Sequence, residues 1–237
     1  LAVFRNLESS GEAVSKIISS KIIPRTLEFI DREAIQAVEH YRPVGLPQHA
    51  DAVLLIELDG HPTAITKEAE KIVGICQSLG ADIEMAEDED ARDNLWIARR
   101  AISPALYHIK PTKINEDIAV PRNKVTEMLK RLRTLSEKSG IKIVNFGHAG
   151  DGNIHVNIMV DKADKAEYEK GASLVEQIFK DTISLGGSIS GEHGVGLTKA
   201  RYIGMEMSQQ EIKIMESLKK VFDPGKILNP GKIFPVA

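Results

Sequence analysis

The sequence predicts an α+β fold of ferredoxin-like type, with repeated βαβ units, a largely antiparallel sheet with helices on one face, and a helical C-terminal part. Over residues 1–160, strand-like apolar runs alternate with segments of helical spacing. A D-G turn at 151–152 lies between two strand-like runs, which is typical of an antiparallel pair. From 161 to 237 the pattern is helical and ends in a turn-rich tail. We expect one domain, in which 1–160 form the sheet region and 161–237 the helical region.

The first half of the chain alternates strands with helices. Residues 1–4 resemble the middle of a strand. The continuous apolar run 52–58 predicts a central strand, and Gly80 is the kind of residue that ends a helix. The expected strands are 52–58 and 82–86, and the expected helices are 8–20, 31–41, 66–79 and about 88–102, with 27–31 leading into the second helix.

The second half repeats this pattern and then turns helical. Gly140 closes a long amphipathic segment, and alternation marks the strands that follow. The expected strands are 114–120, 141–146 and 153–160, and the expected helices are 122–139, 163–185, 198–205 and 209–222. The Asn-Pro-Gly-Lys stretch at 229–232 predicts a turn.

Composition excludes several classes of protein. The 237 residues are 42% hydrophobic, enough for a substantial core. A formal net charge of −3 gives no basic excess, so nucleic acid and anionic lipid are not expected partners. The single cysteine, Cys76, excludes an intrachain disulfide and fits a reducing compartment, which predicts a cytoplasmic protein. No apolar run approaches the ~20 residues that cross a bilayer.

The stretch 147–155 is the first of two glycine-flanked motifs that carry chemical information. Alternation over 153–160 places apolar side chains on one face and polar ones, including His155 and Asn157, on the other. If the chain reverses at the D-G turn, His148 and His155 lie on neighbouring strands and can bind one ion. A hairpin whose histidines sit at the solvent edge is an equally good interpretation of this motif alone.

The second motif is the stretch 191–196. Its glycines flank Glu192 and His193 and allow the backbone to approach a ligand closely. The stretch matches neither a P-loop nor a dinucleotide fingerprint, so phosphate binding is weakly indicated. With His148 and His155, Glu192 completes the open ligand set of a catalytic zinc-type site, and His193 becomes a candidate base. The alternative is a glycine-rich loop with a surface ion pair at Glu192.

Two functions of other classes are compatible with these residues. Two histidines and a glutamate also serve metal-dependent hydrolases, although the sequence has no H-E-x-x-H motif. A non-catalytic binding module would use the histidine loops only to organise a partner surface.

The motifs together resemble a known family. The run 147–157, the loop 191–196 and the ending 222–232 are similar to the C-terminal substrate domain of FAD-linked oxidases of the vanillyl-alcohol oxidase type. Within that superfamily the resemblance is to the group of the glycolate oxidase flavin subunit, D-lactate dehydrogenase and D-2-hydroxyglutarate dehydrogenase. It covers essentially the whole chain. It implies a fragment of a larger flavoprotein that lacks the N-terminal FAD-binding domain, and we expect that fragment to be inactive alone.

The resemblance also implies a role for particular residues. His148, His155 and Glu192 match the metal ligands, and His193 matches the base that takes the substrate hydroxyl proton. A Trp-x-x-Arg element at 96–99 places Arg99 on the substrate carboxylate, a role that suits a bidentate guanidinium. The further implied residues are Asn157 and Lys113 for substrate binding and Asn229 for cofactor binding.

The implied reaction is the FAD-dependent oxidation of a D-2-hydroxy acid, such as glycolate or D-lactate, to the 2-oxo acid. The implied cofactors are FAD, held mainly by the missing domain, and a divalent metal, with zinc expected first and manganese or iron as alternatives. The expected partners are the protein's own FAD domain and an iron–sulfur subunit or an electron-transfer flavoprotein. Such partners would place the protein at the periphery of the inner membrane.

Overall fold

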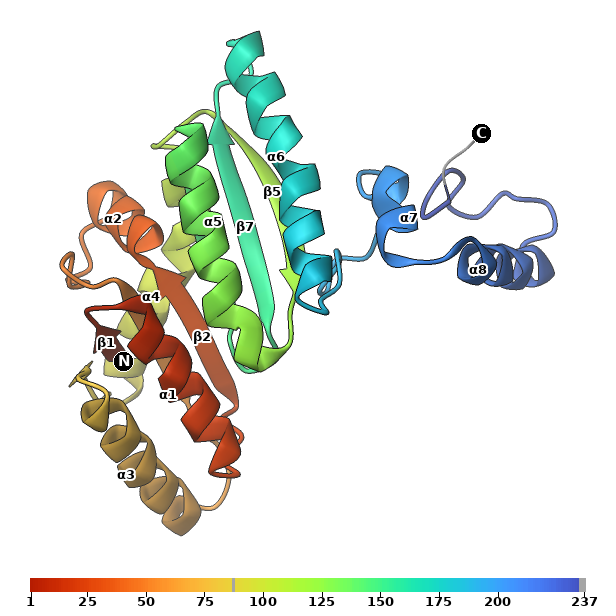
Figure 1. The fold of residues 1–237 in the computed structure, drawn as a ribbon. Helices are drawn as coiled ribbons and strands as arrows, with labels where there is room; N and C mark the ends of the chain where they lie inside the picture. Colours follow the sequence, from red (N-terminus) through yellow and green to blue (C-terminus); the bar gives the residue numbers. More distant parts are fainter. Residues whose placement is uncertain (87, 235–237) are drawn as a thin grey trace.

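The computed structural model describes residues 1–86 and 88–234, which fold around a seven-stranded sheet (Figure 1). The strand order is β4-β1-β3-β2-β6-β7-β5, and every neighbouring pair is antiparallel. The strands are β1 (Ala2–Phe4), β2 (Thr26–Asp31), β3 (Ala52–Glu57), β4 (Asp82–Ile83), β5 (Thr112–Ala119), β6 (Ile143–His148) and β7 (Asn153–Val160).

Most of the helices begin at a polar side chain that caps them. Asn6, Asp31, Asp88, Asp164 and Ser208 each accept a hydrogen bond from a backbone N–H of the first turn. The helices are α1 (Leu7–Ser19), α2 (Arg32–Tyr41), α3 (Pro62–Ser78), α4 (Glu89–Leu106), α5 (Val125–Ser139), α6 (Lys165–Ser184), α7 (Ile203–Glu206) and α8 (Gln209–Phe222), with 3-10 turns at Arg122–Lys124 and Ala200–Tyr202.

The sheet consists of two ferredoxin-like units joined edge to edge. In the first unit the order β4-β1-β3-β2 is that of a βαββαβ motif, with α2 inserted between β2 and β3. The second unit runs β5-α5-β6-β7-α6, and its fourth strand is reduced to one bridge between Ala119 and Ser188. The units meet where β2 pairs with β6. The predicted α+β class with repeated βαβ units and a largely antiparallel sheet is therefore confirmed.

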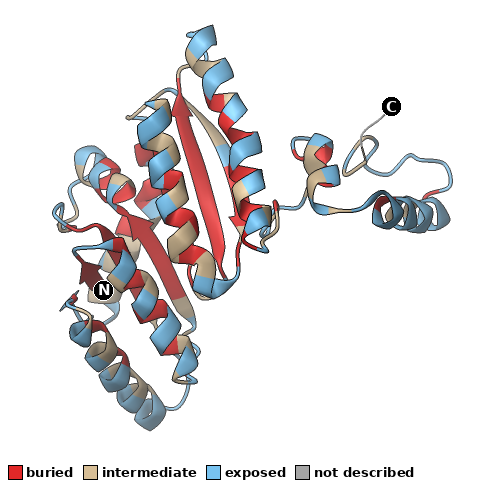
Figure 2. Ribbon diagram, viewed as in Figure 1, coloured by how far each residue is buried: buried red, intermediate tan, exposed pale blue. Residues whose placement is uncertain are grey.

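One face of the sheet carries the main helical layer, and two helices lie on the other face. The larger core joins the apolar sides of α1, α3, α5 and α6 to side chains such as Phe29 and Val156. Figure 2 shows the central strands of the sheet coloured largely as buried. A second core packs α2 and α4 against Ile30, Val53 and Phe146. The prediction of helices on one face omitted this smaller layer, which forms because these strands are apolar on both faces.

Strand β2 was not expected, since 27–31 was expected only to lead into the second helix, yet this strand lies in the middle of the sheet. The other observed elements differ from the expected ones mainly at their ends. The elements 153–160 and 209–222 agree residue for residue, whereas α4 continues through Pro104 to Leu106 and β4 has only two residues. Strand β6 begins at Ile143 and includes His148, instead of spanning 141–146. His148 is therefore held by strand pairing and not by a free loop.

The segment from α8 through residue 234 extends away from the sheet, whereas α6 packs on it (Figure 1). Only Ile212 of α8 is buried, and apolar side chains such as Leu218 and Phe222 are exposed. Among the described residues, no helix has the length and the apolar character that crossing a membrane requires.

Candidate metal centre

The β6–β7 hairpin places His148 and His155 side by side. His148 is the last residue of β6, and His155 lies opposite Phe146 on β7. The turn between them requires Gly152, which has φ +89° and where a Cβ would lie 2.0 Å from the Val120 carbonyl oxygen. The two imidazole rings are 5.4 Å apart between centroids. The chain thus reverses at the D-G turn, as the spacing predicted.

The loop that carries Glu192 and His193 is held over this hairpin by Asp117. Asp117 lies opposite His155 on the neighbouring strand β5. Its carboxylate accepts hydrogen bonds from the backbone N–H groups of Glu192 (3.0 Å) and His193 (2.9 Å). Gly191 is needed for this approach, since a Cβ there would lie 1.7 Å from a side-chain nitrogen of Asn153.

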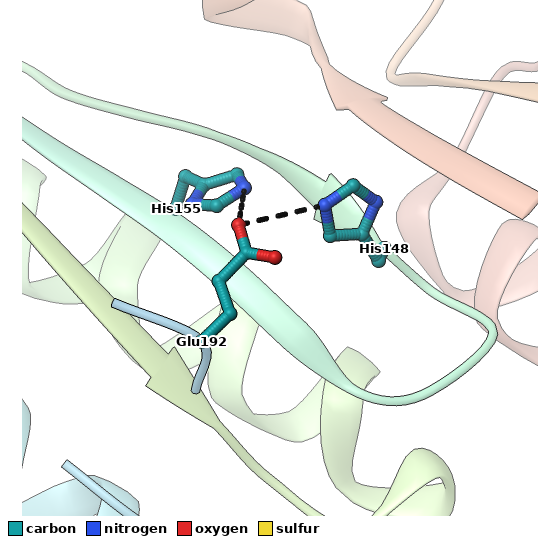
Figure 3. Close-up of side chains that lie close together, drawn as sticks. All are labelled: His148, His155 and Glu192. Atoms are coloured by element: carbon teal, nitrogen blue, oxygen red, sulfur yellow. Dashed lines mark ion pairs between the residues drawn. The ribbon is translucent and has the colours of Figure 1, made fainter. Parts of the chain in front are cut away.

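The three expected metal ligands form one cluster (Figure 3). Glu192 Oε1 lies 3.4 Å from His155 Nε2 and 3.7 Å from His148 Nε2. One ligand atom from each residue lies within 4.8 Å of the others. Ligands of a tetrahedral zinc ion lie about 3.4 Å apart, so this donor set fits such an ion after small adjustments. Three protein ligands leave a coordination position open to a substrate.

His193 lies beside the cluster. Its ring stacks on that of His155 at 5.5 Å between centroids, and its Nε2 lies 3.4 Å from Glu192 Oε1. The side chain is 55% exposed, so an incoming molecule can reach it. This position, next to the ligands and open to solvent, suits a proton acceptor.

The sequence interpretation missed Glu28, which lies behind His148. Glu28 pairs with His148 across β2 and β6, and its Oε1 hydrogen-bonds His148 Nδ1. Its Oε2 accepts a hydrogen bond of 2.7 Å from Arg99 Nε. The sequence signal was a glutamate within the apolar run Leu27–Ile30, because a buried carboxylate is rare without a partner.

These contacts set the charges in the cluster. Burial raises the pKa of Glu28, but the hydrogen bond from His148 and the charge of Arg99 outweigh it and leave that pKa below its usual value. The hydrogen bond to Glu28 raises the pKa of His148, whereas burial lowers the pKa of His155. His155 is therefore neutral near pH 7, which is the form that binds metal.

The three predicted substrate-binding residues, Arg99, Lys113 and Asn157, lie on the same face of the sheet as the cluster. Each of them contacts different neighbours. Arg99 reaches from α4, and its guanidinium carbon lies 4.6 Å from the centroid of Phe146. Lys113 donates a 2.8 Å hydrogen bond to Ser103, and burial lowers its pKa. Asn157 is fully buried and donates a hydrogen bond to the Val144 carbonyl oxygen. Its side chain therefore stabilises the pair of strands β6 and β7 that carries the two histidines.

The structure does not bring Asn229 into this cluster. Asn229 lies in the exposed segment after α8, where Lys232 donates a hydrogen bond to its side chain. That segment is part of the C-terminal extension (Figure 1).

Asp117 gives a pH-dependent prediction. Burial raises its pKa, but hydrogen bonds from His193, Asn153 and Glu192 outweigh burial and lower that pKa to about 2. Ionised Asp117 therefore stabilises the fold above the unfolded pKa of 3.8 by about 2 kcal/mol, which is lost as pH falls towards 2.

We expect the difference in unfolding free energy between wild type and Asp117→Asn to shrink by that amount from pH 6 to pH 2. Urea titrations of both proteins measure it. A difference that is constant with pH would contradict an ionised anchor for the 191–193 loop.

Fold and site together define a class of protein: an α+β domain of two ferredoxin-like units with an open histidine–glutamate cluster at their junction. Residues 1–233 match the family model of FAD linked oxidases, C-terminal domain. The chain belongs to this family.

Similar proteins include oxidoreductases of 2-hydroxy acids. The chain is 43% identical over 235 residues to glycolate oxidase subunit GlcD of Bacillus subtilis (strain 168), covering 99% of this chain and 50% of the relative. It is 36% identical over 215 residues to D-2-hydroxyglutarate dehydrogenase of Stutzerimonas stutzeri (strain A1501), covering 87% and 46%. The chain thus spans about half the length of the curated relatives it matches.

The fold is also found in a solved structure. That of p-cresol methylhydroxylase with substrate bound superposes with a TM-score of 0.75 at 12% identity, covering 99% of this chain and 52% of that one. At this identity the likeness concerns the fold alone.

Proposed function

We propose that this domain binds the substrate in an FAD-dependent oxidoreductase that converts a D-2-hydroxy acid to the 2-oxo acid. The observation that carries the proposal is the guanidinium of Arg99, joined through Glu28 to the His148, His155 and Glu192 cluster. A cation beside an open metal-type site suits a molecule with a carboxylate next to a hydroxyl group. The names of the relatives support this substrate class.

Three residues of this chain would each have a separate role in substrate binding or proton transfer. Arg99 binds the substrate carboxylate, and Lys113 supplies a second positive charge on the same face of the sheet. His193 accepts the proton of the substrate hydroxyl, since an imidazole serves as a base near neutral pH.

Two groups would complete the site. His148, His155 and Glu192 would hold a divalent metal, with zinc first and manganese or iron as alternatives. A bound metal would supply Lewis acidity at the hydroxyl oxygen, and a bound flavin would supply an acceptor for the C2 hydrogen together with its bonding electron pair. We propose that FAD is bound mainly by another domain of the same protein, with Asn229 as the contribution of this chain.

The remaining partners belong to the same proposal. An iron–sulfur subunit or an electron-transfer flavoprotein would serve as the electron acceptor, and the subunit naming of the Bacillus subtilis relative supports a multi-subunit assembly. The buried free Cys76 supports a reducing, cytoplasmic compartment, with any membrane association made through partners.

Turnover assays test the proposed function. The flavin-loaded protein that contains this domain should reduce a dye acceptor with glycolate or D-lactate and discriminate against L-lactate. The 237-residue chain alone should show no turnover with either acid. Hydrolysis of esters or peptides without oxidation of any 2-hydroxy acid would instead identify a metal hydrolase.

A further inference from the structure

We propose that Glu28 is a positioning residue that sets the spacing between the metal ligands and the arginine that binds the substrate carboxylate. This inference rests on the proposed function. The buried Glu28 side chain would hold the metal ligand His148 and the substrate-binding Arg99 at a fixed distance from each other. Both groups must act on adjacent atoms of the same small molecule.

Glu28 lies at the junction of the two ferredoxin-like units. Strands β2 and β6 pair there, and the register places Glu28 directly beside His148. The cluster residues His148 and His155 belong to the second unit, whereas Arg99 follows the first unit on α4. The contact of Glu28 across this junction, together with the packing of Arg99 on Phe146, therefore holds Arg99 in place relative to the histidines.

Both carboxylate oxygens of Glu28 are used, each by a different partner. Oε1 hydrogen-bonds His148 Nδ1, and Oε2 accepts from Arg99 Nε at 2.7 Å. The Glu28 side chain is 5% exposed and that of Arg99 17%, so water competes little for these contacts. One carboxylate thus joins the imidazole and the guanidinium rigidly.

The bond to His148 orients the imidazole for metal binding. A proton on Nδ1 that is shared with Glu28 leaves the Nε2 lone pair free, and Nε2 is the atom that faces Glu192. A carboxylate behind a metal-binding histidine fixes its tautomer in this way.

The bond to Arg99 orients the guanidinium for the substrate. Glu28 uses only Nε, and the packing on Phe146 restricts the plane of the group. Within residues 1–86 and 88–234, no hydrogen bond from the terminal nitrogens of Arg99 is found, so both can donate to a carboxylate.

Glu28→Gln tests the inference, because His148 and Arg99 each use a different oxygen of Glu28, and in glutamine one of the two oxygens is replaced by an NH2 group that only donates. We expect Glu28→Gln to bind zinc about 10- to 100-fold more weakly in chelator competition, the usual effect of losing such a support. In the flavin-loaded protein, KM for the 2-hydroxy acid should rise about tenfold as Arg99 loses its anchor.

Asp31→Asn is the matched control. Asp31 is a buried carboxylate on the same strand, but it accepts hydrogen bonds from Ala34 and Asn145, outside the metal cluster. We expect this variant to lower the melting temperature while zinc affinity and KM stay within about threefold of wild type. If Glu28→Gln does not fold, Glu28→Asp is measured against the same criteria, because its shorter side chain cannot span both partners.

The outcomes separate the inference from the proposed function. Wild-type zinc affinity and KM in Glu28→Gln, or equal losses in Asp31→Asn, would overturn the positioning role while the metal site stands. A wild-type protein that binds no zinc, manganese or iron would overturn the proposed metal site and this inference with it.

Discussion

Replacement of His193 by glutamine lowers kcat for the 2-hydroxy acid by about 10²- to 10⁴-fold, the usual effect of removing a general base. Glutamine keeps the size and polarity of the side chain but cannot take up the hydroxyl proton. The backbone N–H of residue 193 still donates to Asp117, so the loop stays in place. KM should change little.

Zinc content distinguishes a role of His193 as a base from a role in maintaining the metal site. His193 is half-exposed and is not one of the three clustered ligands, so His193→Gln should retain as much zinc as wild type. A kcat within about threefold of wild type would show that another group accepts the proton.

Replacement of Arg99 by methionine lowers kcat/KM by about 10²- to 10³-fold. The substrate carboxylate loses its charge-assisted hydrogen bonds, and Glu28 is left without one of its two partners. Methionine preserves much of the apolar contact with Phe146, which limits the effect on packing. Steady-state kinetics of the flavin-loaded protein measure the change.

Arg100→Met is the matched control, because Arg100 is the exposed neighbour on the same helix and, among the described residues, donates a hydrogen bond only to the Asp93 carbonyl oxygen. Its kcat/KM should equal that of wild type. Equal losses in the two variants would mean that the helix, and not the Arg99 guanidinium, matters to the substrate.

The fold class and the close approach of the two histidines could be predicted because their signals are local. Alternation over 153–160 and the Asp151-Gly152 turn specify a hairpin, and a hairpin is enough to bring His148 near His155. The glycines around Glu192 marked a loop that approaches other backbone closely, and Gly191 does so.

The contacts that support the cluster could not be predicted because they join distant segments. Glu28 and His148 are 120 residues apart, and their pairing depends on which edge strands of the two units meet. The hydrogen bond from the His193 backbone N–H to Asp117 likewise joins residues that are 76 positions apart. The smaller helical layer was missed for a similar reason, since strand apolarity alone does not say which helix covers which face.

The proposed chemistry depends on the binding of a divalent metal by His148, His155 and Glu192. The most direct measurement is metal content by elemental mass spectrometry on protein purified without chelator or metal-affinity resin. His148→Ala combined with His155→Ala is compared with a control in which two exposed histidines, His49 and His61, become alanine. We expect about one zinc, manganese or iron ion per chain in wild type and control, and almost none in the site variant. Equal metal content in all three proteins, or none in wild type, would contradict it.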